Sequence, residues 1–483
     1  MPVASCAKLS LKNISAFMDA NNSLIFHIQG TASTKSRVTV QYWSDGDGPF
    51  ITAPVPTNGT SFSVDVMRLR PSTQYNYEVF LSTSSKKQSL QYQGTFTTGV
   101  LPPALQTANI KVIKGKPTYD LLLLDYNCDN FNGIIAIDSA GQIVWYFQND
   151  NQVFTLAQED NFNIVFNEVS QDIGYTMKEI TADGETAHSI DDRLDDGSLC
   201  APHGRWNHEM LLEPGGKVLT IGADIRTVNI DGNDTLQTGG TVEEWDINKA
   251  TVTRLVSLFD VIDAATDRTA DSNLTTGFFW QGSQGQFAGT VEDWTHTNSL
   301  DVLPNGDILV SNRYLNQLIA IKPDFSGVDW KLGGEGSDFS FPNPDDEFYH
   351  QHDATMLPDG NILLFDNGNT RPDGQGGEYS RAEELKLDFK TMQATEVWEY
   401  RNNPDIFSSA VGSAIRLKNG DTVVDFGVDP VNEDPAVFTV VEADSQGNPM
   451  ATITLSSPGK GDQYRAIPVE SINGESLMPV TTP

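Results

Sequence analysis

Apolar and polar residues alternate along the first part of the chain with a period of two. The pattern recurs in "SRVTVQYW", "SFSVDV", "YNYEVFLS" and "QYQGTFTT", with turn-forming residues between these segments. Because successive side chains of a strand point to opposite faces of a sheet, each segment predicts a strand with one buried face. Residues 1–100 are therefore predicted to form a small antiparallel β-sandwich.

The segment "GVLPPALQT" (99–107) separates this unit from the rest of the chain. Paired prolines interrupt both helices and strands, so the segment is predicted to be a linker. A chain of 483 residues is also too long for one ordinary compact core. We therefore expect a second domain that runs from residue 108 to residue 483.

A pattern of two strands repeats in this second domain. Each copy has an apolar strand, a turn that contains glycine, and a second, mostly apolar strand. Two loose copies cover residues 119–147 and 155–186. The four clear copies are "NHEMLLEPGGKVLTIG" (207–222), "TNSLDVLPNGDILVSN" (297–312), "HDATMLPDGNILLFDN" (352–367) and "GSAIRLKNGDTVVDFG" (412–427).

Six such units, each followed by further strand-like segments, predict an all-β fold: a six-bladed β-propeller behind the N-terminal sandwich. The sequence does not alternate strands with helices, so it does not support an α/β fold. The segment "QYRAIPVESI" (463–472) is predicted to complete the ring by pairing with the first unit. In such a ring, the residues just before each innermost strand meet at one mouth of the central channel.

Histidines recur at fixed places in this repeat. Counting back from the turn proline, or from Lys418 in the last unit, gives two columns that hold four of the seven histidines of the chain. Arg313 ends a second strand, in "VSNRY", among residues typical of a core. A propeller would bring these side chains to one shared site. Six residues before the turn lie His208, Asn298, His352 and Gly412, and eight residues before it lie Trp206, His296, His350 and Ala410.

The residue types in these columns favour an anion over a metal. Histidines can hold a metal, but no carboxylate lies in register with them, and arginine is a poor neighbour for a cation. Arginine with histidine suits a tetrahedral oxyanion such as sulfate or phosphate. Histidine is also a competent nucleophile at such a centre, and a second histidine can protonate the leaving oxygen. A lone histidine before a strand is more often structural, so the hypothesis depends on the set in register.

The charge of the chain limits the classes of molecule that it is expected to bind. Asp and Glu number 65 against 31 Lys and Arg, which gives a formal net charge of -34. Such a surface repels nucleic acid and anionic lipid, so neither is an expected partner. The same acidity fits a protein that is kept soluble in a salty or extracellular setting. No apolar run approaches the ~18 residues of a membrane span.

The three cysteines leave two questions open. Cys128 and Cys200 form either a disulfide or two separate thiols, and the cysteine spacing fits no zinc site. The letters "VASC" resemble the end of a bacterial lipoprotein signal, in which Cys6 would carry a lipid anchor. The alternative is an ordinary surface cysteine.

Four motifs carry a resemblance to a known family: "DWTHTNSLDVLPNGDILVSNR", "VDWKLGG", "HQHDATMLPDGNILLFDNG" and "SRAEELKLD…VWEY". With the matches around them, most of residues 110–430 resemble the bacterial arylsulfotransferases that work without the nucleotide sulfate donor. That family is similar in having a sandwich before a six-bladed propeller. The stretches "LRPSTQYNYEV" (69–79) and "GTFTT" (94–98) resemble the later strands of a fibronectin type III domain, in which the tyrosine at the Tyr75 position closes a corner between strands.

The resemblance implies transfer of a sulfuryl group from a phenolic sulfate ester to a phenol in two steps. It implies small-molecule substrates, no cofactor or metal, and a periplasmic or extracellular location, and it leaves a homodimer open. The nucleophile that becomes a sulfohistidine would be His352, in "QHDA", and His208 would be a second active-site histidine. The histidine and asparagine of the family's "H-x-N" fall on His296 and Asn298, and its arginine falls on Arg313.

Some assignments have competitors. His350 lies two residues before His352, so it is either the nucleophile or a substrate contact. Arg381, in "YSRAEE", is either a second anion contact or a structural residue. Ser409 and Ser413 are candidates to line the site, and the polar loop 366–384 either covers the channel mouth or is solvated.

Two other functions fit the same sequence. The first is a non-catalytic propeller that binds a ligand or a protein, because this fold serves many functions. Such a scaffold would not require the set of histidines, asparagine and arginine. The second is an aryl sulfatase, in which water rather than a phenol takes the sulfuryl group from the same histidine.

Overall fold

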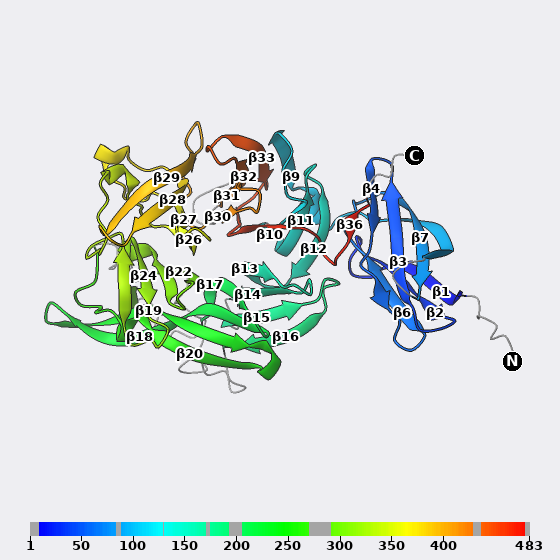
Figure 1. The fold of residues 1–483 in the computed structure, drawn as a ribbon, viewed down its shortest axis with the longest axis horizontal. Helices are drawn as coiled ribbons and strands as arrows, with labels where there is room; N and C mark the ends of the chain where they lie inside the picture. Colours follow the sequence, from blue (N-terminus) through cyan, green and yellow to red (C-terminus); the bar gives the residue numbers. More distant parts are fainter. Residues whose placement is uncertain are drawn as a thin grey trace.

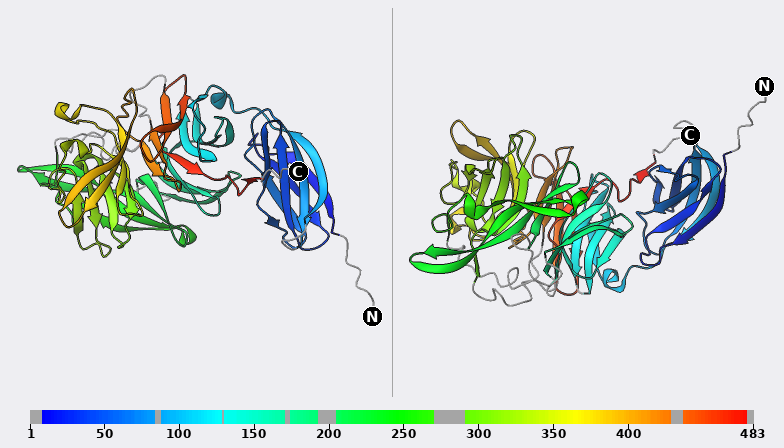
Figure 2. Two further views of the ribbon diagram at one scale, coloured as in Figure 1. Left: turned by 45° about the horizontal axis from the view of Figure 1, so that its top comes forward. Right: turned by 90° about the horizontal axis from the view of Figure 1, so that it is seen from below.

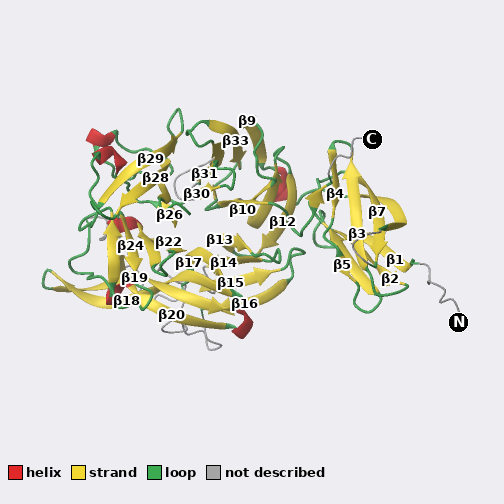
Figure 3. Cartoon of the chain, in the orientation of Figure 1, coloured by secondary structure: helices red, strands yellow, loops and turns green. Residues whose placement is uncertain are grey.

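The computed structural model describes residues 9–83, 88–128, 130–170, 174–192, 205–269, 291–427 and 436–478. In these ranges the chain is almost entirely β, which confirms the predicted fold class in its general form (Figure 3). Helical structure in the described residues is limited to one short helix, α1 (Pro103–Gln106), and to single 3-10 turns. That helix lies in the predicted linker, because a proline is tolerated in the first turn of a helix.

Two antiparallel sheets form the N-terminal unit (Figure 1). Residues alternate between buried and exposed along its strands, for example in β7, so the period of two is confirmed there. The hydroxyl of Tyr75 accepts the backbone N–H of Arg70 at 3.0 Å and so ties a corner between strands. One sheet has the order β1 (Leu11–Met18), β2 (Phe26–Ala32), β6 (Ser61–Val66); the other has the order β36 (Ser476–Leu477), β4 (Asp47–Ile51), β3 (Arg37–Ser44), β7 (Gln74–Ser82), β8 (Ser89–Thr97), with β5 (Val55–Pro56) on β3.

The described residues between 109 and 469 form six further sheets around a common centre (Figure 1). In the second and third sheets the first strand along the chain lies nearest the centre, and the third sheet gains one further strand. In the first sheet the place nearest the centre is taken by two strands from later in the chain. The first three sheets are β10 (Leu121–Cys128), β11 (Phe131–Asp138), β12 (Ile143–Asn149) with β34 (Gly461–Asp462) and β35 (Ala466–Val469); β13 (Gln152–Gln158), β14 (Ile164–Ser170), β15 (Gly174–Ile180), β16 (Thr186–Asp191); and β17 (Asn207–Glu213), β18 (Lys217–Ile230), β19 (Asn233–Asp246), β20 (Thr251–Ser257) with β21 (Val291–Asp293).

The last three sheets follow the same order from the centre outward. Their fourth strands include the segments "VDWKL" and "TEVWEY" that close the sequence repeats. The sheets are β22 (Thr297–Val302), β23 (Ile308–Asn312), β24 (Gln317–Ile321), β25 (Val328–Leu332); β26 (His352–Met356), β27 (Ile362–Asp366), β28 (Arg381–Asp388), β29 (Gln393–Arg401); and β30 (Ser413–Arg416), β31 (Thr422–Phe426), β32 (Val437–Ala443), β33 (Pro449–Ser456), β9 (Asn109–Lys114).

Two exchanges of strands close the ring. Strand β9, from before the first sheet, pairs with β33 of the last sheet. Strands β34 and β35, from after the last sheet, pair with β10 of the first. The predicted pairing of "QYRAIPVESI" with the first unit is therefore confirmed.

The sandwich lies beside the ring and packs against its first sheet (Figure 2). One hydrophobic cluster runs from the sandwich into the first and last sheets of the ring. The guanidinium of Arg70 pairs with Asp138 at 2.7 Å, and the backbone N–H of Leu69 donates to the carbonyl of Val144 at 3.0 Å. The boundary between the two domains near residues 100–108 stays a prediction. In the structure, β36 near the end of the chain returns to the sandwich and pairs with β4.

The innermost strands start with irregular pairing. Register shifts lie between Val153 and Thr155 in β13, and in the same way between Asn207 and Met210, Thr297 and Ser299, and His352 and Thr355. Several residues at these starts have the left-handed backbone that non-glycine residues rarely adopt, among them His208 (φ 57°), His296 (φ 46°) and Asp353 (φ 52°). Bulges of this kind re-aim side chains and are common next to functional sites.

Other expectations concern residues outside this core. Cys128 is buried in β10, whereas Cys6 and Cys200 lie outside the described residues, so a disulfide and a lipid anchor stay untested. Within the described ranges, no helix has the length and apolar character needed to span a membrane.

Candidate functional site

Three histidines of the predicted columns meet at the centre of the ring. His208 lies at the start of β17, His296 precedes β22, and His352 is the first residue of β26. The ring centroids of His208 and His296 are 5.2 Å apart, and those of His208 and His352 are 6.4 Å apart. His208 and His352 are almost fully buried, with exposed fractions of 5% and 1%.

The orientation of His352 is fixed by the amide of Asn367. Nδ1 of His352 lies 2.6 Å from Oδ1 of Asn367. Nδ2 of Asn367 donates to the carbonyls of Ser408 at 2.8 Å and Val411 at 2.9 Å, so the amide cannot turn without losing both bonds. The amide oxygen must therefore accept a proton held by Nδ1, and Nε2 of His352 carries the lone pair.

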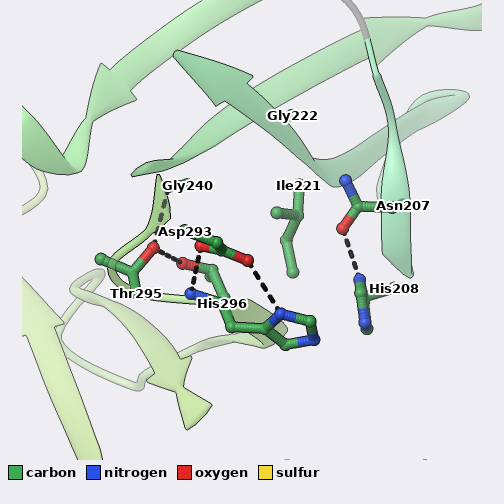
Figure 4. Close-up of a pocket in the computed structure, with 9 residues that line it drawn as sticks. Asn207, His208, Ile221, Gly222, Gly240, Asp293, Thr295 and His296 are labelled. Carbon is green, nitrogen blue, oxygen red and sulfur yellow. Dashed lines mark hydrogen bonds and ion pairs between the residues drawn. The ribbon is translucent and has the colours of Figure 1, made fainter. Parts of the chain in front are cut away.

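The other two histidines are held at the same ring atom (Figure 4). Nδ1 of His208 donates to Oδ1 of Asn207, whose Nδ2 donates to the carbonyl of Arg205 at 2.6 Å. Nδ1 of His296 lies 2.8 Å from Oδ2 of Asp293, and Oδ1 of Asp293 accepts the backbone N–H of His296 at 2.9 Å. Of the three histidines, His296 is the one whose Nδ1 contacts a carboxylate, whereas Nδ1 of His208 and of His352 contacts an amide oxygen.

Burial keeps two of the histidines neutral. Burial is the main cause that lowers the pKa of His208 well below 6.5, and the charges of His296, His352 and two arginines act in the same direction. Burial, followed by the charge of Arg313, also lowers the pKa of His352 well below 6.5. Both rings are therefore uncharged at neutral pH and can offer a lone pair.

Arg313 lies at the other end of the β22–β23 hairpin from His296, and the two ends meet. It begins the 3-10 turn after β23, and its backbone N–H donates to the carbonyl of His296 at 3.1 Å. Its guanidinium donates to the carbonyl of Ser409 at 2.9 Å. The backbone of Ser409 thus contacts the site, while Ser413 is buried at the first residue of β30.

Asn298 occupies the bulge in β22 and is 0% exposed. Its Nδ2 donates to the carbonyl of Gln351 at 2.6 Å. An amide nitrogen has two hydrogens, so a second donor remains on this side chain.

His350 and Arg381 do not share the position of the other predicted residues. The ring of His350 lies 5.9 Å from that of Tyr314, which in turn lies 4.8 Å from that of His296. The donors of Arg381 are directed at oxygens of its own sheet and the preceding loop: Asp366 at 3.1 Å, Glu396 at 2.7 Å, Glu399 at 3.3 Å, Glu383 at 2.7 Å, and the carbonyls of Asp345 and Glu347. These contacts support the structural alternative for Arg381, and its contact with an anion stays a prediction.

The loop 366–384 is neither wholly solvated nor wholly buried. Its ends are held inside the protein, where Arg371 pairs with Asp366 and Ser380 donates to the carbonyl of Asn367 at 2.8 Å. Its middle, at Pro372–Gly374, is exposed.

Two site residues missed in the sequence come from the segment that closes the ring. Arg465 pairs with Glu209 at 2.7 Å and with Asp353 at 3.2 Å. The ring of Tyr464 lies 5.6 Å from that of His208 and 6.1 Å from that of His352. The signal for Arg465 was the acid that directly follows each histidine, in "NHEM" and "QHDA", since a buried acid needs a cation.

Phe154 is a third residue that the sequence analysis missed. It lies in the bulge of β13, and its ring is 4.9 Å from that of His208 and 4.9 Å from that of Tyr464. The predicted second repeat begins at residue 155, one residue after Phe154. Counted back six residues from the turn at Asp160, Phe154 falls in the same column as His208, Asn298 and His352.

A narrow space lies between His208 and His296, and His352 is not among the residues that line it (Figure 4). His208 and Asn207 line one side of it, and His296, Asp293 and Thr295 line the other. In the described part of the chain, no group of three or more His, Cys, Asp or Glu residues is arranged to hold a metal ion. The site offers neutral imidazoles beside guanidinium groups, which suits an oxyanion.

The comparisons with known proteins agree with this chemistry. The family model described as Arylsulfotransferase (ASST) matches residues 107–465, which cover the six sheets around the centre except β35. The chain belongs to the arylsulfotransferase family. Its match covers His208, His296, Asn298, Arg313 and His352. No curated protein matches the chain significantly.

Solved structures give only a distant likeness to this arylsulfotransferase. A protein of unknown function from Bacteroides caccae is 15% identical, with 69% of this chain and 93% of that chain covered and a TM-score of 0.37. A streptogramin B lyase is 9% identical, with 78% and 100% covered and a TM-score of 0.36. A gluconolactonase from Xanthomonas campestris is 9% identical, with 74% and 93% covered and a TM-score of 0.35. These scores are too low to support any argument about function.

Proposed function

We propose that this arylsulfotransferase moves a sulfuryl group from a phenolic sulfate ester to a phenol through a sulfohistidine at His352, without a nucleotide sulfate donor. The observation that carries the proposal is the hydrogen bond from Nδ1 of His352 to Asn367, which leaves the lone pair on Nε2. A neutral, oriented imidazole beside Arg313 is what attack on an anionic sulfate ester requires.

In the first step, the lone pair on Nε2 of His352 forms a bond to sulfur while the bond from sulfur to the aryl oxygen breaks. The electron pair leaves with the phenolate, which takes a proton from His296. Asp293 balances the charge of the protonated His296 through their contact of 2.8 Å. The second step runs in the opposite direction: the acceptor phenol gives its proton to His296, its oxygen bonds to sulfur, and the electrons of the N–S bond return to Nε2.

Arg313 and the remaining donor of Asn298 hold the sulfuryl oxygens during both steps. Sulfuryl transfer, like phosphoryl transfer, has a loose transition state, so positioning and charge stabilisation carry most of the catalysis. Phe154, which is half-buried, and Tyr464 supply an aromatic wall beside His208 for the aryl group.

The six sheets would be the blades of a six-bladed β-propeller (108–483), and the N-terminal unit (1–100) a fibronectin type III-like domain. Strand exchange at both ends of the ring and the Tyr75 corner support these assignments. A periplasmic or extracellular location belongs to the same proposal.

The test is to give the purified protein 4-nitrophenyl sulfate and phenol, with no nucleotide or metal added. We expect release of 4-nitrophenol, formation of phenyl sulfate, and one added sulfuryl group on the protein when the donor is given alone. Mapping of that group by mass analysis should place it on His352. Release of nitrophenol that continues beyond one equivalent per protein in the absence of phenol would identify a sulfatase, and a folded protein with no adduct and no product across a panel of aryl sulfates would leave a binding role.

A further inference from the structure

We infer that the amide of Asn367 keeps the Nδ1 proton on His352 after the ring is sulfated, and that this retained proton makes the sulfohistidine able to pass its group on. The inference rests on the proposed function. It makes Asn367 a positioning residue with a chemical task in the second step, in addition to orienting the nucleophile for the first.

The side-chain amide of Asn367 can present only its oxygen to His352. Both hydrogens of Nδ2 are used, one on the carbonyl of Ser408 and one on the carbonyl of Val411. Only Oδ1 can face His352, and an amide oxygen accepts a hydrogen bond without taking the proton. Asn367, Ser408 and His352 are all buried, so water does not offer Nδ1 another partner easily.

The two carboxylates next to His352 and Asn367 along the chain are engaged elsewhere. Asp353 pairs with Arg465 at 3.2 Å and accepts the backbone N–H of Ala414 at 2.9 Å. One oxygen of Asp366 accepts the backbone N–H groups of Tyr349 at 2.9 Å and Gly368 at 3.0 Å, and the other pairs with Arg371 and Arg381. In the described part of the chain, ion pairs between histidine and a carboxylate involve His27, His188 and His296, and not His352. The ring that becomes sulfated therefore has no base at Nδ1.

The consequence follows from the balance of charge in the two steps. When Nε2 bonds to sulfur and Nδ1 keeps its proton, the sulfated ring is cationic. In the second step the acceptor oxygen bonds to sulfur, and the electrons of the N–S bond return to a ring that leaves as neutral imidazole. If a base removed the Nδ1 proton, the leaving group would instead be an imidazole anion, which is far more basic and leaves far more slowly.

The same site contains the contrasting arrangement. His296, which in the proposed mechanism gives and takes a proton, is held by the carboxylate of Asp293. His352, which bonds to sulfur, is held by an amide. A carboxylate at position 367 would favour the first step, because it makes the ring more nucleophilic, and would trap the intermediate before the second.

The test uses Asn367→Asp in the full chain, with 4-nitrophenyl sulfate as the donor and phenol as the acceptor. A rapid-mixing burst of 4-nitrophenol measures the first step, and steady turnover with phenol measures the second. We expect the burst to remain and turnover to fall by roughly 10²-fold or more, the scale of a lost proton-transfer contribution. Intact mass should then show the sulfated protein accumulating in the presence of phenol.

Asn207→Asp is the matched control, because it makes the same change at Nδ1 of His208, which is not sulfated. It should not cause the sulfated protein to accumulate. Unchanged turnover in Asn367→Asp, or equal losses of burst and turnover in a variant that keeps the wild-type melting temperature, would overturn the inference. Absence of any burst or adduct in the wild type would instead refute the proposed function, and this inference with it.

A measurement on the wild type keeps the inference testable if Asn367→Asp does not fold. With ¹⁵N-labelled histidine, the sulfated protein prepared with donor alone should show a one-bond N–H coupling at Nδ1 of His352 at neutral pH. A sulfated ring that lacks this proton would contradict the inference.

Discussion

The ring of Tyr464 stacks on that of Phe154, with centroids 4.9 Å apart and planes 18° from parallel. Phe154 comes from the second sheet and Tyr464 from the segment that closes the ring after the sixth. The backbone N–H of Tyr464 is anchored on Asp125 of β10 at 2.9 Å. One wall of the candidate site therefore exists only when the chain has closed on itself.

The two histidines in "HQHD" should differ in their effect on transfer. His352→Ala removes the proposed nucleophile and should abolish the phenol-dependent release of 4-nitrophenol. His350→Ala should keep much of it, because the ring of His350 contacts Tyr314, and Tyr314 lies between it and His296. The reverse result, together with a sulfuryl group mapped to His350, would move the nucleophile to that residue.

Arg313→Ala should slow transfer strongly. Removing a charged donor that stabilises the transition state costs on the order of 3 kcal/mol at the barrier. The kcat/KM for the aryl sulfate measures this loss, and Arg313→Lys should recover part of it because the charge is kept. Arg381→Met is the contrasting variant: it leaves buried Glu383 without its guanidinium partner and Asp366 with Arg371 alone, so it should lower the free energy of unfolding by roughly 3–5 kcal/mol. Equal effects of both variants on stability, with no difference in rate, would contradict these roles.

The first step should resist acid. Burial and the charge of Arg313 lower the pKa of His352 well below 6.5, so the lone pair on Nε2 persists as the pH falls through that value. The rate constant of the nitrophenol burst should thus not decline as the pH falls through 6.5, and should decline only at lower pH. A burst that declines with a midpoint at or above 6.5 would show that the ring is not held neutral in this way.

Asp425 should make the protein less stable as the pH rises. Burial raises the pKa of this carboxyl from 3.8 to about 8. The folded protein keeps a proton that the unfolded chain loses above 3.8, so this contribution to stability is complete below 3.8 and is lost as the pH rises toward about 8. The loss is at most about 1.4 kcal/mol per pH unit.

Asp425→Asn cannot ionise, so its urea midpoint should change less than that of the wild type between acid and neutral pH. The exposed Asp359→Asn is a suitable control and should keep the wild-type slope. Parallel pH profiles for Asp425→Asn and the wild type would show that Asp425 does not contribute.

The sequence predicted most of the repeated strand pattern, but few of the contacts between side chains within the site. The columns that contain His208, Asn298 and His352 were readable because each innermost strand starts the same distance before its turn. The closing segment was also predicted, but its Tyr464 and Arg465 were not, because nothing in a strand pattern shows which residues of a pairing segment point inward.

The holding groups of the histidines were not readable for a different reason. Asn367 comes from the end of β27 and meets His352 of β26, while Asp293 lies before the bulge that turns His296 inward. Their contacts depend on the backbone at the bulges, which no periodicity encodes. The ion pairs of Arg381 had a readable signal, since Glu383 lies two residues on, on the same face of β28.

The closing segment also has a consequence for synthesis. A ribosome releases residues 461–469 after all the other strands of the six sheets, and until then β10 has no partner on that edge and Glu209 and Asp353 have no guanidinium between them. A growing polypeptide therefore has no finished reaction centre. Fragments produced by premature termination should be inert toward aryl sulfates, even when most of their sheets have already formed.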